Sequence, residues 1–398
     1  PGADGSPAWE SVPTEAELPE TRRAARLPKE RPQTGDKGIR LQDVADGKVD
    51  MADFVAQFSD DELCTIVRGE GMNSPRVTPG TAGAIGGVSD ALQHYGLPAA
   101  CCSDGPSGIR MDCGTVAFAM PNGTCLAATF NEGLSEELYS MEGLELRKNH
   151  VDTLLGPGIN IHRHPLNGRN FEYFSEDPLL TGKMACAQLR GLHRWGVTGT
   201  IKHFAANNQE TRRLTISSDL SERALHEIYL PAFEEAVKTA QPKTVMCSYN
   251  KINGVYASEN KMLLTDILRD QWGFEGYVVS DWGAANDRVK GLEAGLDLEM
   301  PSSNGYNDAK IVAAVQNGSL DEAVLDRAVE RILKVVFSYV DARRPDTVFD
   351  RAKDHAEAVA VETQCAVLLT NQGVLPLGTD QKIAYIGEFA AAPRYQGG

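Results

Sequence analysis

The sequence contains few cysteines and no long apolar run. Eight cysteines in 398 residues are too sparse for a disulfide scaffold, and no Cys-x-x-Cys pair or His-linked partner indicates a zinc site. No apolar stretch approaches the roughly 20 residues that a membrane helix needs, so we expect no membrane partner. Free thiols favour a cytoplasmic protein. Secretion stays open, because the chain begins at Pro1 rather than at a methionine.

Positive charge is also scarce. The chain carries 39 Lys and Arg against 55 Asp and Glu, a formal net charge of −16. A nucleic-acid partner needs a cationic surface to bind its phosphates, so we expect none, and a neutral small molecule fits better. Hydrophobic residues make up 42% of the chain and charged residues 24%, which is typical of a globular enzyme.

Motifs for phosphate, dinucleotide and metal binding are missing as well. No Gly-x-x-x-x-Gly-Lys-Ser/Thr loop, convincing dinucleotide fingerprint or His-Glu-x-x-His pair occurs. The glycine-rich stretches 79–83 and 86–87 lack a following phosphate-site helix, so we predict loops there. These patterns indicate neither a metal ion nor an organic cofactor.

What the sequence does contain is a long alternation of β-type runs and amphipathic helical stretches. The predicted strands are 98–102, 151–155, 198–201, 243–247, 277–279 and 296–300, and the predicted helices include 134–149, 179–195, 221–240, 261–271 and 321–339. The alternation predicts an α/β fold, a (β/α)8 TIM-type barrel. A doubly wound open sheet would show the same pattern and stays open as the alternative.

The flanking segments differ in character from this alternation. Residues 1–37 are rich in Pro, Glu, Thr and Arg and predict an extended lead-in, before a barrel over 38–340. Residues 341–354 are expected to be a linker. A helix and a strand predicted over 355–369 and 382–387 would begin a second α/β (sandwich) domain over 355–398. One helix and one strand cannot bury a core, so we expect this domain to be truncated.

Asp281 is the most prominent candidate for chemistry. It follows the strongly β-prone run 277–279, and catalytic groups of α/β barrels lie at the carboxyl ends of strands. Trp282 beside it could supply an apolar platform for a sugar ring. A helix N-cap or an ordinary loop residue is the alternative for Asp281.

Cationic candidates follow other predicted strands. Lys202 and His203 follow the strand 198–201, where both side chains could turn toward the mouth of a barrel and donate to hydroxyls. A surface lysine beside a core histidine is the alternative. Arg169 could clamp a hydroxyl or a carboxylate, or it could form a structural salt bridge with a neighbouring acidic residue.

Three further residues complete the candidate set. Asp104 precedes Gly-Pro and could accept hydrogen bonds from sugar hydroxyls or close an Asx turn. Tyr249 could place a hydroxyl beside Asp281. Met246 could form an apolar wall, although plain core packing is the more frequent role of methionine.

Six segments, in this order along the chain, resemble glycoside hydrolase family 3, the β-glucosidase-like group. They are residues 104–110, 156–161, 168–178, 202–204, 246–250 and 276–282, and the last reads Gly-Tyr-Val-Val-Ser-Asp-Trp. The likeness extends from about residue 38 to the end of the chain.

The resemblance implies a role for each matched position. Asp281 would be the nucleophile of a retaining, exo-acting β-glycosidase, which removes terminal non-reducing β-D-glucosyl residues through a covalent glycosyl-enzyme. The sugar would be held by Asp104, Arg169, Lys202, His203 and Tyr249, with Met246 and Trp282 shaping the pocket. Small β-glucosides or oligosaccharides are the implied substrates, and no metal or organic cofactor is expected in this family.

The resemblance leaves several alternatives. In β-glucosidases of this family the acid/base Glu usually comes from the second domain, so we expect this chain to lack it. Glu172 and Glu176 belong to a segment with structural and sugar-positioning roles. A non-catalytic carbohydrate-binding barrel, a β-xylosidase and a broad-specificity glycosidase stay open. So does an aldolase-type barrel with Lys202 as a Schiff-base amine. The oligomeric state is open too, a homo-oligomer included.

Overall fold

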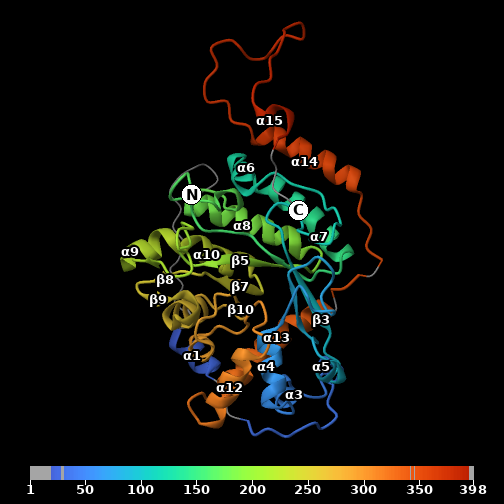
Figure 1. Ribbon diagram of the computed structural model, residues 1–398, viewed down its shortest axis with the longest axis vertical. Coiled ribbons are helices and arrows are strands. Elements are labelled where there is room, and N and C mark those ends of the chain that lie inside the picture. The colour runs from blue at the N-terminus through green and yellow to red at the C-terminus, as the bar shows by residue number, and fades with distance from the viewer. Residues whose placement is uncertain (1–18, 28–30, 341, 345, 394–398) are drawn as a thin grey trace, which may run out of the picture.

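Residues 19–27, 31–340, 342–344 and 346–393 are described by the computed structural model. They form an α/β fold in which helices cover a curled sheet (Figure 1). The α/β class is therefore confirmed. Among these residues no helix combines the length and the apolar content that crossing a membrane requires.

The main sheet has seven strands. They are, in spatial order, β1 (Glu70–Gly71), β2 (Gly83–Gly86), β3 (Ala99–Asp104), β4 (Thr153–Leu155), β5 (Thr198–Phe204), β7 (Thr244–Cys247) and β10 (Tyr277–Ser280). A small second sheet comprises β6 (Ser217–Ser218), β8 (Lys251–Ile252) and β9 (Val255–Tyr256).

Helices fill most of the connections. The α-helices are α1 (Pro19–Arg26), α2 (Leu41–Ala45), α3 (Met51–Val55), α4 (Asp60–Arg68), α5 (Asp90–His94), α6 (Gly123–Ala128), α7 (Glu132–Lys148), α8 (Pro178–His193), α9 (Glu222–Ala224), α10 (Pro231–Glu235), α11 (Arg288–Ala294), α12 (Tyr306–Gln316), α13 (Glu322–Val340), α14 (Arg351–Cys365) and α15 (Glu388–Ala391). Two short 3₁₀ turns are η1 (Asn170–Glu172) and η4 (Ala257–Glu259), and three π-helical stretches are η2 (Leu225–Tyr229), η3 (Ala236–Ala240) and η5 (Met262–Gln271).

The sheet differs from eight parallel strands. From β3 to β10 neighbouring strands pair in parallel, but β1 pairs with β2, and β2 with β3, in antiparallel fashion. The stretch between β1 and β2 contains no helix, whereas a parallel return needs a crossover of a dozen or more residues. The result is a curled half-barrel. The expected strand 296–300 contributes an isolated bridge from Leu298 to Val279.

The loops predicted over 79–83 and 86–87 are confirmed at 79–82 and 87, but Gly83 and Gly86 belong to β2, so the prediction was wrong at these two residues. Gly83 lies between its two neighbouring strands, and a Cβ atom there would lie 2.6 Å from the backbone oxygen of Glu70. Glycine is needed here for the close approach of two backbones, a role that strand propensity does not reveal.

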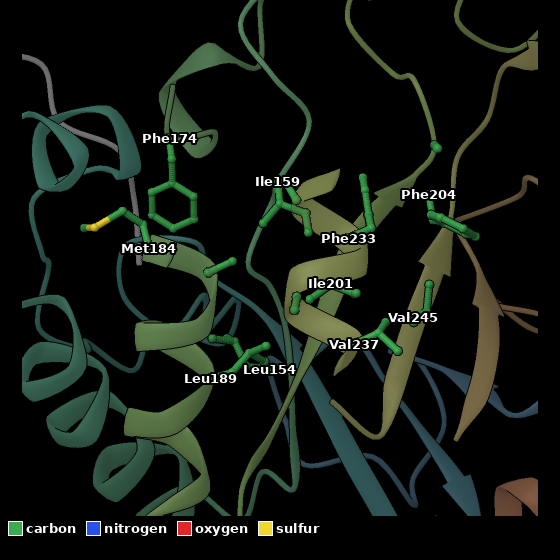
Figure 2. Packing of buried hydrophobic residues seen from close by; sticks show 14 of the residues in the cluster. Leu154, Ile159, Phe174, Met184, Leu189, Ile201, Phe204, Phe233, Val237 and Val245 are labelled. Atoms are coloured by element: carbon green, nitrogen blue, oxygen red, sulfur yellow. The ribbon is translucent and has the colours of Figure 1, made fainter. Parts of the chain in front are cut away.

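The helices begin where their capping residues stand. Ser59 and Glu62 form a reciprocal capping box at α4. Asp177 caps α8, whose first residue is Pro178. Apolar side chains of α8 and α10 pack onto β5 and β7 in the larger core cluster (Figure 2). In this cluster Ile201 on β5 is fully buried. The packed helices thereby fix the strand ends that carry the candidate residues.

The segments outside the barrel are described only in part. Residues 1–18 and 28–30 of the expected lead-in lie outside the described residues, while 19–26 form α1, whose Arg22 donates to the backbone oxygen of Gln271 at 2.6 Å. Residues 341 and 345 of the expected linker also lie outside them. Helix α14 lies against α6 and α7 (Figure 1).

The strand expected over 382–387 does not form, so that prediction was wrong. The described segment 366–387 is irregular and exposed, and it projects beyond α14 in Figure 1. No strand of the described residues lies beside it, and a lone strand leaves its backbone groups unpaired. The expectation that a second domain begins here stays a prediction.

Candidate active site

The carboxyl ends of β3, β5, β7 and β10 surround a cavity of about 350 Å³. Seven of the eight candidate residues line it: Asp104, Arg169, Lys202, Met246, Tyr249, Asp281 and Trp282. Strand ends that are far apart in the sequence thus meet around one space, as expected for an α/β barrel. The eighth candidate, His203, is fully buried and lies against the Asp281 carboxylate.

Asp281 follows β10 directly and is 7% exposed. Its Oδ1 accepts a hydrogen bond from the backbone N–H of Trp282 at 2.7 Å. Its Oδ2 lies 3.5 Å from Nε2 of His203 and 3.8 Å from a terminal nitrogen of Arg169. The Tyr249 hydroxyl donates to the backbone oxygen of Trp282 at 2.9 Å. One carboxylate oxygen is therefore fixed by the backbone while the other faces donors at longer range.

Two opposing effects act on the pKa of Asp281. Burial raises it, because the charged form loses its hydration. The charges of Arg169 and Lys202 and the hydrogen bond from the Trp282 N–H lower it. The net pKa stays above the ordinary value, because the neighbouring cations favour the ionised form but do not fully offset burial.

Lys202 is a buried cation held between two carboxylates. Its Nζ lies 2.7 Å from Oδ1 of Asp104 and 3.6 Å from Oε2 of Glu172. Burial alone would lower the pKa of Lys202, but Asp104 and Glu172 raise it above the ordinary value. Burial likewise opposes ionisation of Asp104, and Lys202 and Arg169 hold the pKa of this carboxyl below its usual range. A Schiff-base amine must lose its proton, so the aldolase-type hypothesis is disfavoured.

Arg169 combines the two roles that its sequence context left open, a structural salt bridge and a group that faces the cavity. Its Nε donates to Glu172 as a structural salt bridge, while its other nitrogens point toward Asp281 and the cavity. Burial lowers the pKa of Arg169, and the charges of Glu172 and Asp281 raise it, with a net rise. The guanidinium thus remains charged beside the candidate nucleophile.

The apolar candidates differ in exposure. Met246 lies on β7, is 2% exposed and belongs to the second core cluster, so core packing and cavity lining coincide in one side chain. Trp282 is half-buried and packs against the same cluster. It offers part of its ring to the cavity, as an aromatic platform for a sugar requires.

Sequence reasoning missed several residues of the site. Arg213 lines the cavity, lies 4.5 Å from the Tyr249 ring centroid and pairs with Glu210 at 2.7 Å. Glu172 was assigned no individual role, yet it joins Arg169 to Lys202. Tyr173 contacts His203 through its hydroxyl. Glu172 and Tyr173 lie within the matched segment 168–178, which was the one available signal, whereas Arg213 lies outside all six segments.

The arrangement supplies a buried carboxylate next to a ring of donors. The carboxylate could attack an electrophilic carbon, and the guanidinium, ammonium and phenol groups could bind several hydroxyls of one sugar. Within the part of the chain that the structure describes, no group of three or more His, Cys, Asp and Glu residues could hold a metal ion.

Comparison with known proteins gives one consistent family. Residues 47–335 match the model described as the glycosyl hydrolase family 3 N-terminal domain. A β-glucosidase of Ruminococcus albus is 52% identical over 83% of this chain and 36% of its own length. An exo-α-(1→6)-L-arabinopyranosidase of Bifidobacterium longum is 43% identical over 80% of this chain and 45% of its own length.

Solved structures agree with this result. β-Glucosidase 3B of Thermotoga neapolitana, in complex with α-D-glucose, is 40% identical with a TM-score of 0.77 over 82% of this chain and 48% of that one. The chain thus spans less than half the length of these relatives.

Proposed function

The chain belongs to glycosyl hydrolase family 3, and from this membership we propose that it is the nucleophile-bearing part of a retaining, exo-acting β-glycosidase, a β-glucosidase in the first instance. The observation that carries the proposal is the position of Asp281. It is a buried carboxylate at the end of a strand, with one oxygen fixed by a backbone N–H and the other facing the Arg169 guanidinium and the His203 ring.

The proposed reaction is a double displacement at the anomeric carbon. An oxygen of ionised Asp281 attacks this carbon while the glycosidic bond breaks, and the leaving oxygen takes a proton from a second carboxyl. Water then displaces Asp281 and returns a proton to that second carboxylate. Arg169 and Lys202 assist by stabilising the ionised nucleophile before the attack.

The acid/base is proposed to lie outside this chain. Besides Asp281, four carboxyl groups stand at the cavity or its cations: Asp104, Asp112, Glu172 and Glu210. Asp104 and Glu172 are ion-paired with Lys202, Glu172 also with Arg169, Asp112 with Arg110, and Glu210 with Arg213. For Asp104, Lys202 and Arg169 hold the pKa below its usual range, so this carboxyl is ionised and has no proton to give a leaving group. All four carboxyl groups are engaged with cations, and we propose that they accept hydrogen bonds or hold these cations.

The proposed substrates are small β-glucosides or oligosaccharides with a terminal glucosyl residue. The glucose complex of the Thermotoga neapolitana relative supports glucose as the bound sugar. One relative is an arabinopyranosidase, so other pyranosides are also considered as substrates. Xylosides should therefore be assayed beside glucosides, which also tests for broad specificity.

The decisive experiment is covalent labelling. The chain is incubated with 2,4-dinitrophenyl 2-deoxy-2-fluoro-β-glucoside, whose leaving group departs without protonation, and peptides are sequenced by mass spectrometry. We expect one fluoroglucosyl group on Asp281 and none on the Asp281→Asn variant. Folded chain that binds glucose in calorimetry but stays unlabelled would identify a non-catalytic carbohydrate-binding barrel instead.

A further inference from the structure

Tyr173, His203 and Asp281 form a buried line behind the cavity. The Tyr173 hydroxyl lies 3.1 Å from Nδ1 of His203, and Nε2 of the same ring lies 3.5 Å from Oδ2 of Asp281. The Tyr173 and His203 rings meet edge to face, with centroids 6.1 Å apart. Both side chains are fully buried, so water does not compete for these contacts.

His203 is a neutral ring in this setting. Burial lowers its pKa well below the ordinary value, and the charges of Arg169, Lys202 and Arg213 lower it further. A neutral imidazole carries its single proton on one nitrogen and accepts on the other. Which nitrogen is protonated therefore decides whether His203 presents a donor or an acceptor to Asp281.

The surrounding hydrogen bonds favour one tautomer. The side-chain amide of Asn207 donates to the Tyr173 hydroxyl at 3.2 Å and to Oε1 of Glu210 at 3.1 Å. The hydroxyl thus receives one hydrogen bond and has its own hydrogen to give. Two acceptors are in reach, Nδ1 of His203 at 3.1 Å and the backbone oxygen of Asn207 at 3.4 Å. The shorter contact leads to His203.

The contact between Nε2 of His203 and Oδ2 of Asp281 favours the same tautomer. Among the described residues neither Nε2 of His203 nor Oδ2 of Asp281 has a hydrogen-bond partner. If Nε2 carried a lone pair, it would face the lone pairs of Oδ2 of Asp281, and two buried acceptors in contact are costly. A proton on Nε2 converts the contact into a hydrogen bond that can shorten once substrate is bound.

We infer that Tyr173 is a positioning residue that holds His203 as the Nε2–H tautomer, so that His203 donates a hydrogen bond to the nucleophile Asp281. This role rests on the proposed function of Asp281. It gives the nucleophile a neutral donor in addition to the Trp282 N–H and the charges of Arg169 and Lys202. Burial opposes ionisation of Asp281, and this donor acts against that effect.

The tautomer can be read directly by NMR, without any activity. Long-range ¹H–¹⁵N correlation on the chain labelled with ¹⁵N-histidine separates protonated from unprotonated ring nitrogens, and His203→Gln assigns the signals. We expect a protonated Nε2 and a hydrogen-bonded, unprotonated Nδ1. In Tyr173→Phe the Nδ1 signal should move to the unbonded position. A protonated Nδ1 in the wild type, or an unchanged His203 signal in Tyr173→Phe, would overturn the inference.

Tyr339→Phe is the matched control. It also removes a buried tyrosine hydroxyl, one bonded to the Thr153 side chain at 2.7 Å. Its His203 signals should stay in place. A shift as large as in Tyr173→Phe would show a general packing effect and refute a specific role.

Inactivation kinetics test the consequence for Asp281. Tyr173→Phe should slow inactivation by the fluoroglucoside about tenfold, the effect of weakening one hydrogen bond to a charged group. On top of His203→Gln the same change should cost less than about twofold, because Tyr173 acts through His203. Equal slowing in both backgrounds would refute this. If the wild type is not inactivated at all, the proposed function fails, while the NMR result still decides the tautomer.

Discussion

Lys202 shows how one side chain can serve both the fold and the site. It is 2% exposed, and its ammonium forms ion pairs with both Asp104 and Glu172. Removing one partner of a buried ion pair leaves an uncompensated charge behind. The same cation also lowers the pKa of Asp281. Stability and chemistry are therefore coupled at this position.

Replacing Lys202 by Met should destabilise the chain strongly. The expected loss is roughly 3–5 kcal/mol of unfolding free energy, toward the lower end because Asp104 is partly exposed. Urea unfolding followed by circular dichroism measures it. The control is Lys183→Met, which breaks a pair of similar length with Glu235 that is substantially exposed and should cost no more than about 1 kcal/mol. Equal losses would refute the central role of Lys202.

At the residue scale, the sequence predicted which residues reach the cavity better than it predicted which side chains contact each other. Asp281 and Lys202 directly follow predicted strands and Arg169 lies in a matched segment, so their meeting at one cavity was predictable. The sequence could not predict that Glu172 lies between Arg169 and Lys202, or that Tyr173 reaches His203. Such contacts depend on side-chain directions in a loop, and periodicity does not determine those directions.

At the scale of elements, the predicted helices match the structure closely and the strands less so. Helix α7 was predicted over 134–149 and spans Glu132–Lys148, because an Asn131 cap and a long helical pattern define it. Strand β2 was missed. Its four residues include two glycines, and its place depends on close backbone contact rather than on β-prone side chains.

The contact between α7 and α14 contains an acidic group that bears on stability. Glu145 on α7 is 1% exposed, and burial raises its pKa to about 7, against the opposing effects of the nearby Phe118 backbone and the charge of Arg351 on α14. In the unfolded chain the pKa of this carboxyl returns to about 4.5. The pKa of Glu145 is higher in the folded chain than in the unfolded chain. The contribution of this carboxyl to stability is therefore fully present below the unfolded pKa and is lost as pH rises toward 7.

Glu145→Gln should therefore stabilise the chain in a pH-dependent way. The variant should exceed the wild type by about 3 kcal/mol at pH 7 and by about 1 kcal/mol at pH 5. Urea unfolding at both pH values measures the difference. Glu137→Gln, on the same helix but half-exposed and paired with Arg194, should change stability by less than about 1 kcal/mol at either pH. A gain for Glu145→Gln that is the same at both pH values would contradict the assignment.

At the scale of the whole molecule, the barrel and the segment beyond it contrast sharply. The alternation of strands and helices predicted the α/β fold because each parallel return needs a helix. The curl and the antiparallel start were not predictable, since they depend on contacts between strands distant in sequence. Beyond α14, residues 366–389 expose many apolar side chains, including Leu369 and Ile386 at about nine-tenths of their surface.

This exposed apolar segment should make the isolated chain self-associate. Monomeric proteins rarely expose contiguous apolar surface beyond a few hundred Å², so sedimentation velocity should show association that grows with concentration. Leu369→Ser combined with Ile386→Ser should weaken it while changing the unfolding free energy by less than about 0.5 kcal/mol, because neither side chain is packed. Leu166→Ser, at an equally exposed leucine in a loop of the barrel, should leave association unchanged. If the double variant instead associates like the wild type, the apolar segment is not the contact. If it loses stability, residues 366–389 pack against the barrel in solution.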